Sequence, residues 1–164
     1  MKTTVAVDTK SLAVASVKAR LKRRHDLVDA KPVLRKAAKI GEIGKVIADK
    51  GYDSEDFLTF ITHELHAKPV VDLKYRDKPA DKTRGELRKQ LKQDFPSRDY
   101  PQRNMSETIN STTKRRYNHV IRARKHHTQK TEVLLKYLTR NLTLSKIVEI
   151  LKDFYKANFF LLLN

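Results

Sequence analysis

The first residues of the chain alternate between hydrophobic and polar positions in a way typical of strands. Residues 4–8 and 11–17 form two short valine-rich runs, and a polar stretch separates them. This pattern predicts a β-hairpin at the start of the fold. Asp8 lies at the expected turn, where aspartate side chains commonly bind backbone amides, so a turn role is favoured over a catalytic one.

The next segments change from a helical rhythm to short apolar runs. A helix is expected to open at Asp29 or Ala30, with Pro32 in its first turn and glycines after residue 40 ending it. Residues 45–49 and 68–73 read as strands, with a helix over residues 54–66 between them, and two strands joined in this way are expected to be parallel. The order of elements predicts an α/β fold built on a mixed sheet.

Asp49 stands at the end of the first of these two strands, directly before a glycine turn. In α/β folds this position faces a ligand, because the carboxyl ends of the strands border the binding crevice. Asp49 is therefore a candidate site residue.

The second half of the chain is polar and basic before it becomes helical. Residues 74–103 form a basic excursion, in which Thr83 and Glu86 have the spacing of a capping box for a short helix. Its cations either follow a phosphate backbone or make a solvated face. A helix is expected to begin near Ser106 and to continue through the basic cluster, and two C-terminal helices over residues 128–164 are expected to break at Asn141. Residues 1–164 are interpreted as one domain.

Composition narrows the class of partner. The chain has 164 residues, with 36 lysines and arginines against 19 acids and a net charge of +17. Such an excess favours a polyanion, and nucleic acid is the commonest one, with an anionic membrane surface as the competitor. No stretch approaches the roughly 20 apolar residues of a membrane span. With no cysteine and no signal peptide in the sequence, a cytoplasmic protein that binds DNA is expected.

Two histidine motifs are candidate metal sites. His25-Asp26 either orients a base or ligates a metal, or it caps the next helix, and the capping role is favoured. The run from His63 to His66 has the pattern HExH. Zinc proteases need HExxH, because only that spacing places both imidazoles on one helix face, so a zinc site is not expected.

The segment from Tyr100 to Lys114 carries the densest candidate chemistry. Tyr100, Arg103, Glu107 and Lys114 follow the pattern Y-x2-R-x3-E-x6-K. Glu107 is expected in the first turn of its helix, with Asn110 and Lys114 farther along the same face. A carboxylate among cations and hydrogen-bond donors suits a metal ion beside a phosphate. The alternative is a basic amphipathic helix whose one acid makes solvated ion pairs.

This segment resembles the Y-R-E-K signature of DDE transposases encoded by prokaryotic insertion sequences. The resemblance implies that Glu107 is a catalytic carboxylate and that Tyr100, Arg103 and Lys114 contact the transposon end. Residues 48–54 and the His25-Asp26 pair also look like family segments, and they imply a second catalytic carboxylate at Asp49. Asn110 and Arg115 match residues beside the signature and are carried over as DNA contacts.

The resemblance further implies an RNase H-like fold, a homodimer on DNA and strand cleavage followed by strand transfer. Two-metal phosphoryl transfer needs clustered carboxylates, and Asp49 and Glu107 are the candidate ligands for Mg²⁺ or Mn²⁺. One feature departs from the family: its first aspartate lies on a strand ahead of the hairpin, and here Met1 precedes the predicted hairpin almost at once. The sequence is thus interpreted as the C-terminal part of a transposase that lacks the first strand, binds DNA and is not catalytically competent alone.

Two other interpretations stay open at this point. A non-enzymatic basic nucleic-acid-binding protein would bind DNA with a steep salt dependence and no need for metal. A different RNase H-like nuclease would degrade DNA or hybrids without preference for particular ends. Whether the chain is an enzyme by itself is therefore left undecided by the sequence.

Overall fold

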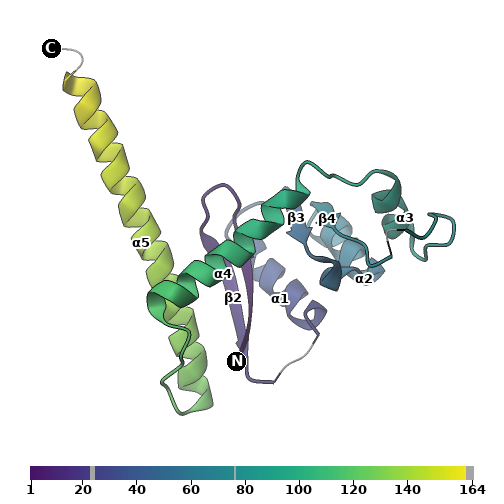
Figure 1. Ribbon diagram of the computed structural model, residues 1–164, viewed down its shortest axis with the longest axis horizontal. Coiled ribbons are helices and arrows are strands. Elements are labelled where there is room, and N and C mark those ends of the chain that lie inside the picture. The colour runs from purple at the N-terminus through teal and green to yellow at the C-terminus, as the bar shows by residue number, and fades with distance from the viewer. Residues whose placement is uncertain (23–24, 76, 162–164) are drawn as a thin grey trace. The chain divides into compact units, whose positions relative to one another are not determined.

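The computed structural model describes residues 1–22, 25–75 and 77–161, with side chains described up to residue 152 (Figure 1). The chain divides into two compact units, residues 1–111 and 112–164. The expectation of a single domain stays a prediction.

The first unit opens with the predicted hairpin. Strands β1 (Lys2–Val7) and β2 (Val14–Arg20) pair antiparallel, with Val5 opposite Val17. The carboxylate of Asp8 accepts the amide N–H groups of Lys10 and Ser11 at 3.1 Å each and the Ser11 hydroxyl at 2.5 Å. These bonds hold the turn and lower the pKa of Asp8, the Ser11 hydroxyl having the largest effect. The predicted turn role of Asp8 is confirmed.

Helix α1 (Leu27–Ala38) begins earlier than the sequence predicted. Pro32 consequently lies inside the helix rather than in its first turn, so that part of the prediction is wrong. The proline has no N–H to donate to the carbonyl four residues back, at position 28. Val28 is exposed, which leaves room for water to replace the lost bond. Because of the early start, Asp29 lies within the first turn of α1, where it faces the hairpin.

Asp29 anchors α1 to the hairpin. Its side chain is 2% exposed, and it accepts Arg20 Nε at 2.6 and 2.8 Å and pairs with Lys18 Nζ at 2.9 Å. Burial by itself raises the pKa of Asp29, but the two β2 cations outweigh it and the net pKa is lowered. The Ser16 hydroxyl adds a bond to the Val33 carbonyl at 2.7 Å. These contacts hold α1 against the hairpin.

The second half of this unit is a strand–helix–strand element, as predicted. Strands β3 (Lys45–Ala48) and β4 (Lys68–Val71) are parallel, and α2 (Glu55–Thr59) followed by a π-helical turn η2 (Phe60–Glu64) connects them. This element holds much of the core, whose most deeply buried apolar side chains are Phe57, Leu58, Phe60, Ile61, Val70 and Val71. The π-helical turn was not predicted.

The strands form two separate two-stranded sheets, β1–β2 and β3–β4, among the described residues. The α/β class is confirmed, but one continuous mixed sheet is not formed by this part of the chain. Helix α1 packs against the hairpin, and its Ala30 belongs to the same core cluster as Val46 of β3. One helix thus supports both sheets.

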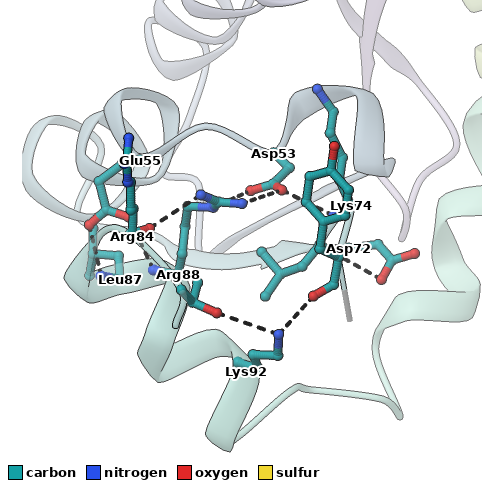
Figure 2. Close-up of polar contacts among 11 residues, drawn as sticks. Asp53, Glu55, Asp72, Lys74, Arg84, Leu87, Arg88 and Lys92 are labelled. Carbon is teal, nitrogen blue, oxygen red and sulfur yellow. Dashed lines mark hydrogen bonds and ion pairs between the residues drawn. The ribbon is translucent and has the colours of Figure 1, made fainter. Parts of the chain in front are cut away.

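The basic excursion carries helix α3 (Glu86–Gln93), and the predicted capping box is wrong. Gly85 is the N-cap residue, with φ of +94°, and a Cβ added there would overlap the Glu55 carboxylate. That carboxylate accepts the amide N–H groups of Leu87 at 2.8 Å and Arg88 at 3.1 Å (Figure 2). A distant acid on α2 therefore takes the role that Thr83 and Glu86 were expected to share.

Helix α4 (Asn104–Tyr117) follows a 3₁₀ turn η3 (Tyr100–Arg103) and crosses the boundary between the units. It ends at Tyr117 instead of continuing through the basic cluster, and Asn118 adopts φ of +64° there. Glu132 accepts the amide N–H groups of Arg122 and Ala123 at 3.0 and 2.9 Å, which fixes the connection that replaces the expected helix.

Helix α5 (His126–Leu161) is continuous, so the predicted break at Asn141 is wrong. No glycine or proline lies between residues 126 and 161, and asparagine alone costs a helix interior less than about 1 kcal/mol. The Thr143 hydroxyl bonds back to the Thr139 carbonyl at 2.9 Å, a bond that helical threonines make without ending the helix.

Candidate functional site

Asp49 lies immediately after β3, at the carboxyl end of a parallel strand, as the sequence predicted. Its Oδ1 accepts the Lys50 amide N–H at 2.7 Å and caps the 3₁₀ turn η1 (Lys50–Tyr52). The side chain remains 50% exposed, and its second oxygen faces Arg103. One oxygen thus fixes the position of the carboxylate, while the other is directed toward the neighbouring cation.

Arg103 joins the two predicted carboxylates. Its Nη1 lies 2.6 Å from Glu107 Oε1 and 3.7 Å from Asp49 Oδ2. Glu107 is in the first turn of α4, as predicted, and its side chain is 64% exposed. The fold therefore brings together Asp49 and Glu107, which are far apart in the sequence, around one guanidinium.

Tyr100 supports this arginine. The Arg103 guanidinium lies 5.8 Å from the Tyr100 ring centroid, and Phe95 packs edge-on against the same ring at 5.4 Å. The Tyr100 hydroxyl donates to Asp72 Oδ2 at 3.5 Å. Burial first, and the Asp72 charge second, raise the pKa of Tyr100, so the phenol stays protonated. Asp72 was missed by sequence reasoning, and its place directly after β4 is the signal that would have indicated it.

More negative charge surrounds the glycine turn after Asp49. Burial raises the pKa of Tyr52 to about 12, and the charges of Asp26, Asp49 and Asp29 contribute in that order. A Cβ at Gly51 would lie 4.0 Å from Asp26 Oδ2. Three carboxylates thus act on one tyrosine beside the candidate site.

The His25-Asp26 pair borders the start of α1, and the predicted capping role is found for His25 but not for Asp26. Asp26 occupies the N-cap position without a side-chain cap bond, and its carboxylate pairs with Lys2. The His25 Nδ1 atom accepts the Leu27 amide N–H at 3.5 Å. These contacts are structural ones at the end of the hairpin layer.

The donor set suits a hard divalent cation only in part. Asp49 and Glu107 offer exposed carboxylate oxygens, and Mg²⁺ commonly uses one or two such ligands and keeps several waters. Nowhere in the described part of the chain do three or more His, Cys, Asp or Glu side chains cluster closely enough to hold a metal ion. Asp49 and Glu107 are therefore only two potential ligands, and both lie beside the Arg103 guanidinium.

The remaining candidate DNA contacts lie along α4. Asn110 is half-buried and belongs to the first unit, whereas Lys114 and Arg115 are exposed and belong to the second. The structure therefore brings Tyr100, Arg103, Glu107 and Asp49 together. DNA binding by Lys114 and Arg115 stays a prediction. None of the described helices is both long and apolar enough to span a bilayer.

Comparison with known proteins identifies the family of the chain. The family model described as "Transposase DDE domain" matches residues 1–142, which is most of the chain and includes every candidate site residue. No curated protein and no solved structure matches the chain. The match covers both sheets, the excursion, α4 and the first part of α5, and it shows that the chain belongs to the transposase DDE domain family.

Proposed function

We propose that this protein acts on DNA as a transposase of the insertion-sequence type, with Asp49 and Glu107 as the carboxylates of its phosphoryl-transfer site. One observation carries the proposal. Asp49 ends a strand 54 residues before Arg103, yet both it and Glu107 lie beside the Arg103 guanidinium. An arginine placed between two carboxylates is ready to exchange them for a DNA phosphate when a cation takes its place.

The residues have separable roles in this proposal. Asp49 and Glu107 would hold a divalent ion, Mg²⁺ or Mn²⁺, and the ion would supply a positive charge that stabilises the developing charge on a phosphate oxygen. Arg103 then turns from the carboxylates to a phosphate oxygen, with the Tyr100 ring behind it. The Lys50 amide already holds the Asp49 carboxylate in place, so binding of the ion need not order this side chain.

DNA binding follows from the charge of the chain. Lys114 and Arg115 are exposed on α4, and the net charge of +17 supplies a general attraction to phosphates. The proposal includes an RNase H-like fold, because an antiparallel hairpin followed by a parallel strand–helix–strand element suits it. It also includes a homodimer that holds two element ends.

A second candidate is a DNA-binding protein without catalysis. It is favoured by the absence of a third clustered acid in the described structure and by the ion pairs that neutralise Asp49 and Glu107. The first candidate cuts DNA in a reaction that requires a divalent metal ion, whereas the second binds DNA without cutting it.

A strand-cleavage assay separates them. The purified chain is incubated with Mg²⁺ or Mn²⁺ and end-labelled DNA that carries the inverted repeats flanking its gene. The proposal expects nicks at the repeat, lost in Glu107→Gln and retained in Glu86→Gln, an exposed acid of α3 that pairs with Lys89. Binding to the repeat and to random duplex at the same affinity, without nicks and without any effect of a divalent ion, would favour the non-catalytic candidate.

A further inference from the structure

Two acids directly follow the neighbouring strands β3 and β4. The parallel register places the last residues of these strands opposite each other, so Asp49 and Asp72 lie at the same end of the sheet. Asp49 Oδ1 accepts the Lys50 amide N–H at 2.7 Å. In the same way, Asp72 Oδ1 accepts the Leu73 amide N–H at 3.0 Å. The backbone therefore fixes one oxygen of each carboxylate at this end of the sheet.

The second oxygens of the two acids face different residues of the turn η3. Asp49 Oδ2 lies 3.7 Å from Arg103 Nη1 at the end of the turn. Asp72 Oδ2 accepts the Tyr100 hydroxyl at 3.5 Å at its beginning. The Arg103 guanidinium in turn lies 5.8 Å from the centroid of the Tyr100 ring. A continuous series of contacts, from Asp72 through the Tyr100 phenol to Arg103, thus connects the end of β4 to the candidate site.

Further contacts hold the Tyr100 ring and the start of η3. Phe95 packs edge-on against the ring at 5.4 Å. Asp99, the residue before the turn, accepts Lys45 Nζ of β3 at 2.7 Å. The side chains of Lys45 and Asp99 are only about one-third exposed, so this ion pair is partly shielded from water. The ring is therefore held independently of Arg103 and stays in place when the guanidinium moves.

The electrostatics of the phenol link Asp72 to Arg103. When Arg103 exchanges Asp49 and Glu107 for a phosphate, it loses both carboxylates, whereas the Tyr100 ring remains beside it. The attraction between a guanidinium and an aromatic ring comes from the negative charge on the ring face. A phenol that donates its hydroxyl to a carboxylate carries more of that charge than a free phenol. Asp72 can therefore act on Arg103 without touching it.

From this arrangement we propose that Asp72 is a positioning residue, which through the Tyr100 phenol holds the Arg103 guanidinium where a DNA phosphate binds. This inference rests on the proposed function and adds a residue that the sequence pattern did not indicate. Asp72 has no role as a third metal ligand in it, because three such side chains do not cluster in the part of the chain that the structure describes. Direct contact of the Asp72 carboxylate with DNA is excluded by like charge.

The sign of one mutational effect separates positioning from simple charge. The affinity of the complete chain is measured by fluorescence anisotropy, with duplex carrying the inverted repeats that flank its gene and with random duplex. Asp72→Ala is expected to bind the repeat about tenfold more weakly, as after loss of a hydrogen bond to a charged group. Charge alone would act the other way, because loss of an acid favours DNA binding. The control Asp81→Ala removes an exposed acid of the same excursion and should bind as tightly as the parent chain or more tightly.

A double-mutant cycle tests whether Asp72 acts through the phenol. In a Tyr100→Phe chain, Asp72→Ala should weaken repeat binding no further, because the hydroxyl that Asp72 accepts is gone. Asp72→Asn keeps an acceptor for the hydroxyl and should recover most of the affinity. Equal losses from Asp72→Ala with and without the hydroxyl would overturn the inference. A comparable loss of Mn²⁺ affinity in Asp72→Ala would also overturn it, since Asp72 would then be a metal ligand.

A measurement without DNA keeps this inference distinct from the proposed function. The nuclear Overhauser effect between the Tyr100 ring and the Arg103 side chain should weaken in Asp72→Ala, with circular dichroism confirming that the variant is folded. An unchanged effect in the folded variant would overturn the inference, whatever the chain does on DNA. A weakened effect in a chain that binds the repeat no better than random duplex would refute the proposed function instead, while supporting the contact from Asp72 through Tyr100 to Arg103.

Discussion

Loss of the Arg88 side chain is expected to detach α3 from the core of the first unit. Asp53 has a side chain that is 0% exposed, and it accepts Arg88 Nε at 2.7 Å and Arg88 Nη2 at 2.8 Å (Figure 2). Its one other described partner is the Lys74 amide at 3.0 Å. The change Arg88→Met keeps the apolar stem but leaves a buried carboxylate without its cation.

The expected loss of folding free energy follows from the burial of Asp53 and Arg88. Removing one partner of a fully buried ion pair costs about 3–5 kcal/mol. Arg88 is 21% exposed, so water moderates the loss, and we expect about 2–3 kcal/mol. For a chain of this size, that corresponds to a fall in Tm of about 4–12 °C.

Thermal unfolding followed by circular dichroism measures this loss. The control is Arg84→Met, which removes the same charge from an exposed side chain four residues earlier. Arg88 Nη1 donates to the backbone carbonyl of Arg84, and this control keeps that carbonyl. The double variant Asp53→Asn with Arg88→Met should be less destabilised than the sum of the single changes. A Tm for Arg88→Met within 1 °C of the control would refute the assignment of a buried charge pair.

Three further changes test other contacts. The pKa of Asp29 is lowered below 3.8, so the carboxylate stabilises the fold above that pH, and this stabilisation is lost as the pH falls through the lowered pKa. Asp29→Asn should therefore be less stable than the parent chain near neutrality and lose less stability on acidification, which urea unfolding at pH 7 and pH 3 measures. Glu55→Ala removes the cap of α3 and should cost about 1–2 kcal/mol, whereas the exposed Glu86→Ala should cost under about 0.5 kcal/mol in the same assay. Asp8→Ala removes three turn bonds and should speed amide exchange at Ser11 severalfold, with unchanged exchange contradicting the turn role.

Local patterns predicted the elements that local forces determine. The Asp8 turn, both strand pairs and the intervening helix were predicted because period-two alternation, turn chemistry and a buried apolar run act over short distances. The position of Glu107 in the first turn of α4 was predicted for the same reason. These features needed no knowledge of distant residues.

The errors in the helices have physical causes. The capping box failed because Glu55, more than 30 residues away in the chain, satisfies the first amides of α3. Pro32 is interior because α1 begins at Leu27, and contacts of Asp29 with the β2 cations stabilise that first turn. Asn141 did not end its helix, since a polar residue without a glycine or proline is a weak stop signal.

The residues of the candidate site were proposed from the sequence, whereas their arrangement was not. The strand end indicated Asp49 and the Y-x2-R-x3-E-x6-K pattern indicated Arg103 and Glu107, and only the fold shows that Arg103 contacts both acids. Local patterns also could not predict that the strands form two separate sheets, because strand order depends on long-range pairing.

The central claim is that Asp49 and Glu107 together hold a divalent cation on DNA. Titration with Mn²⁺, followed by electron paramagnetic resonance in the presence of duplex DNA, tests it most directly. The proposal predicts tight binding by the parent chain and by Asp56→Asn, an exposed acid paired with Lys31, and at least tenfold weaker binding by Asp49→Asn and by Glu107→Gln. Equal Mn²⁺ affinity in all four proteins would contradict it.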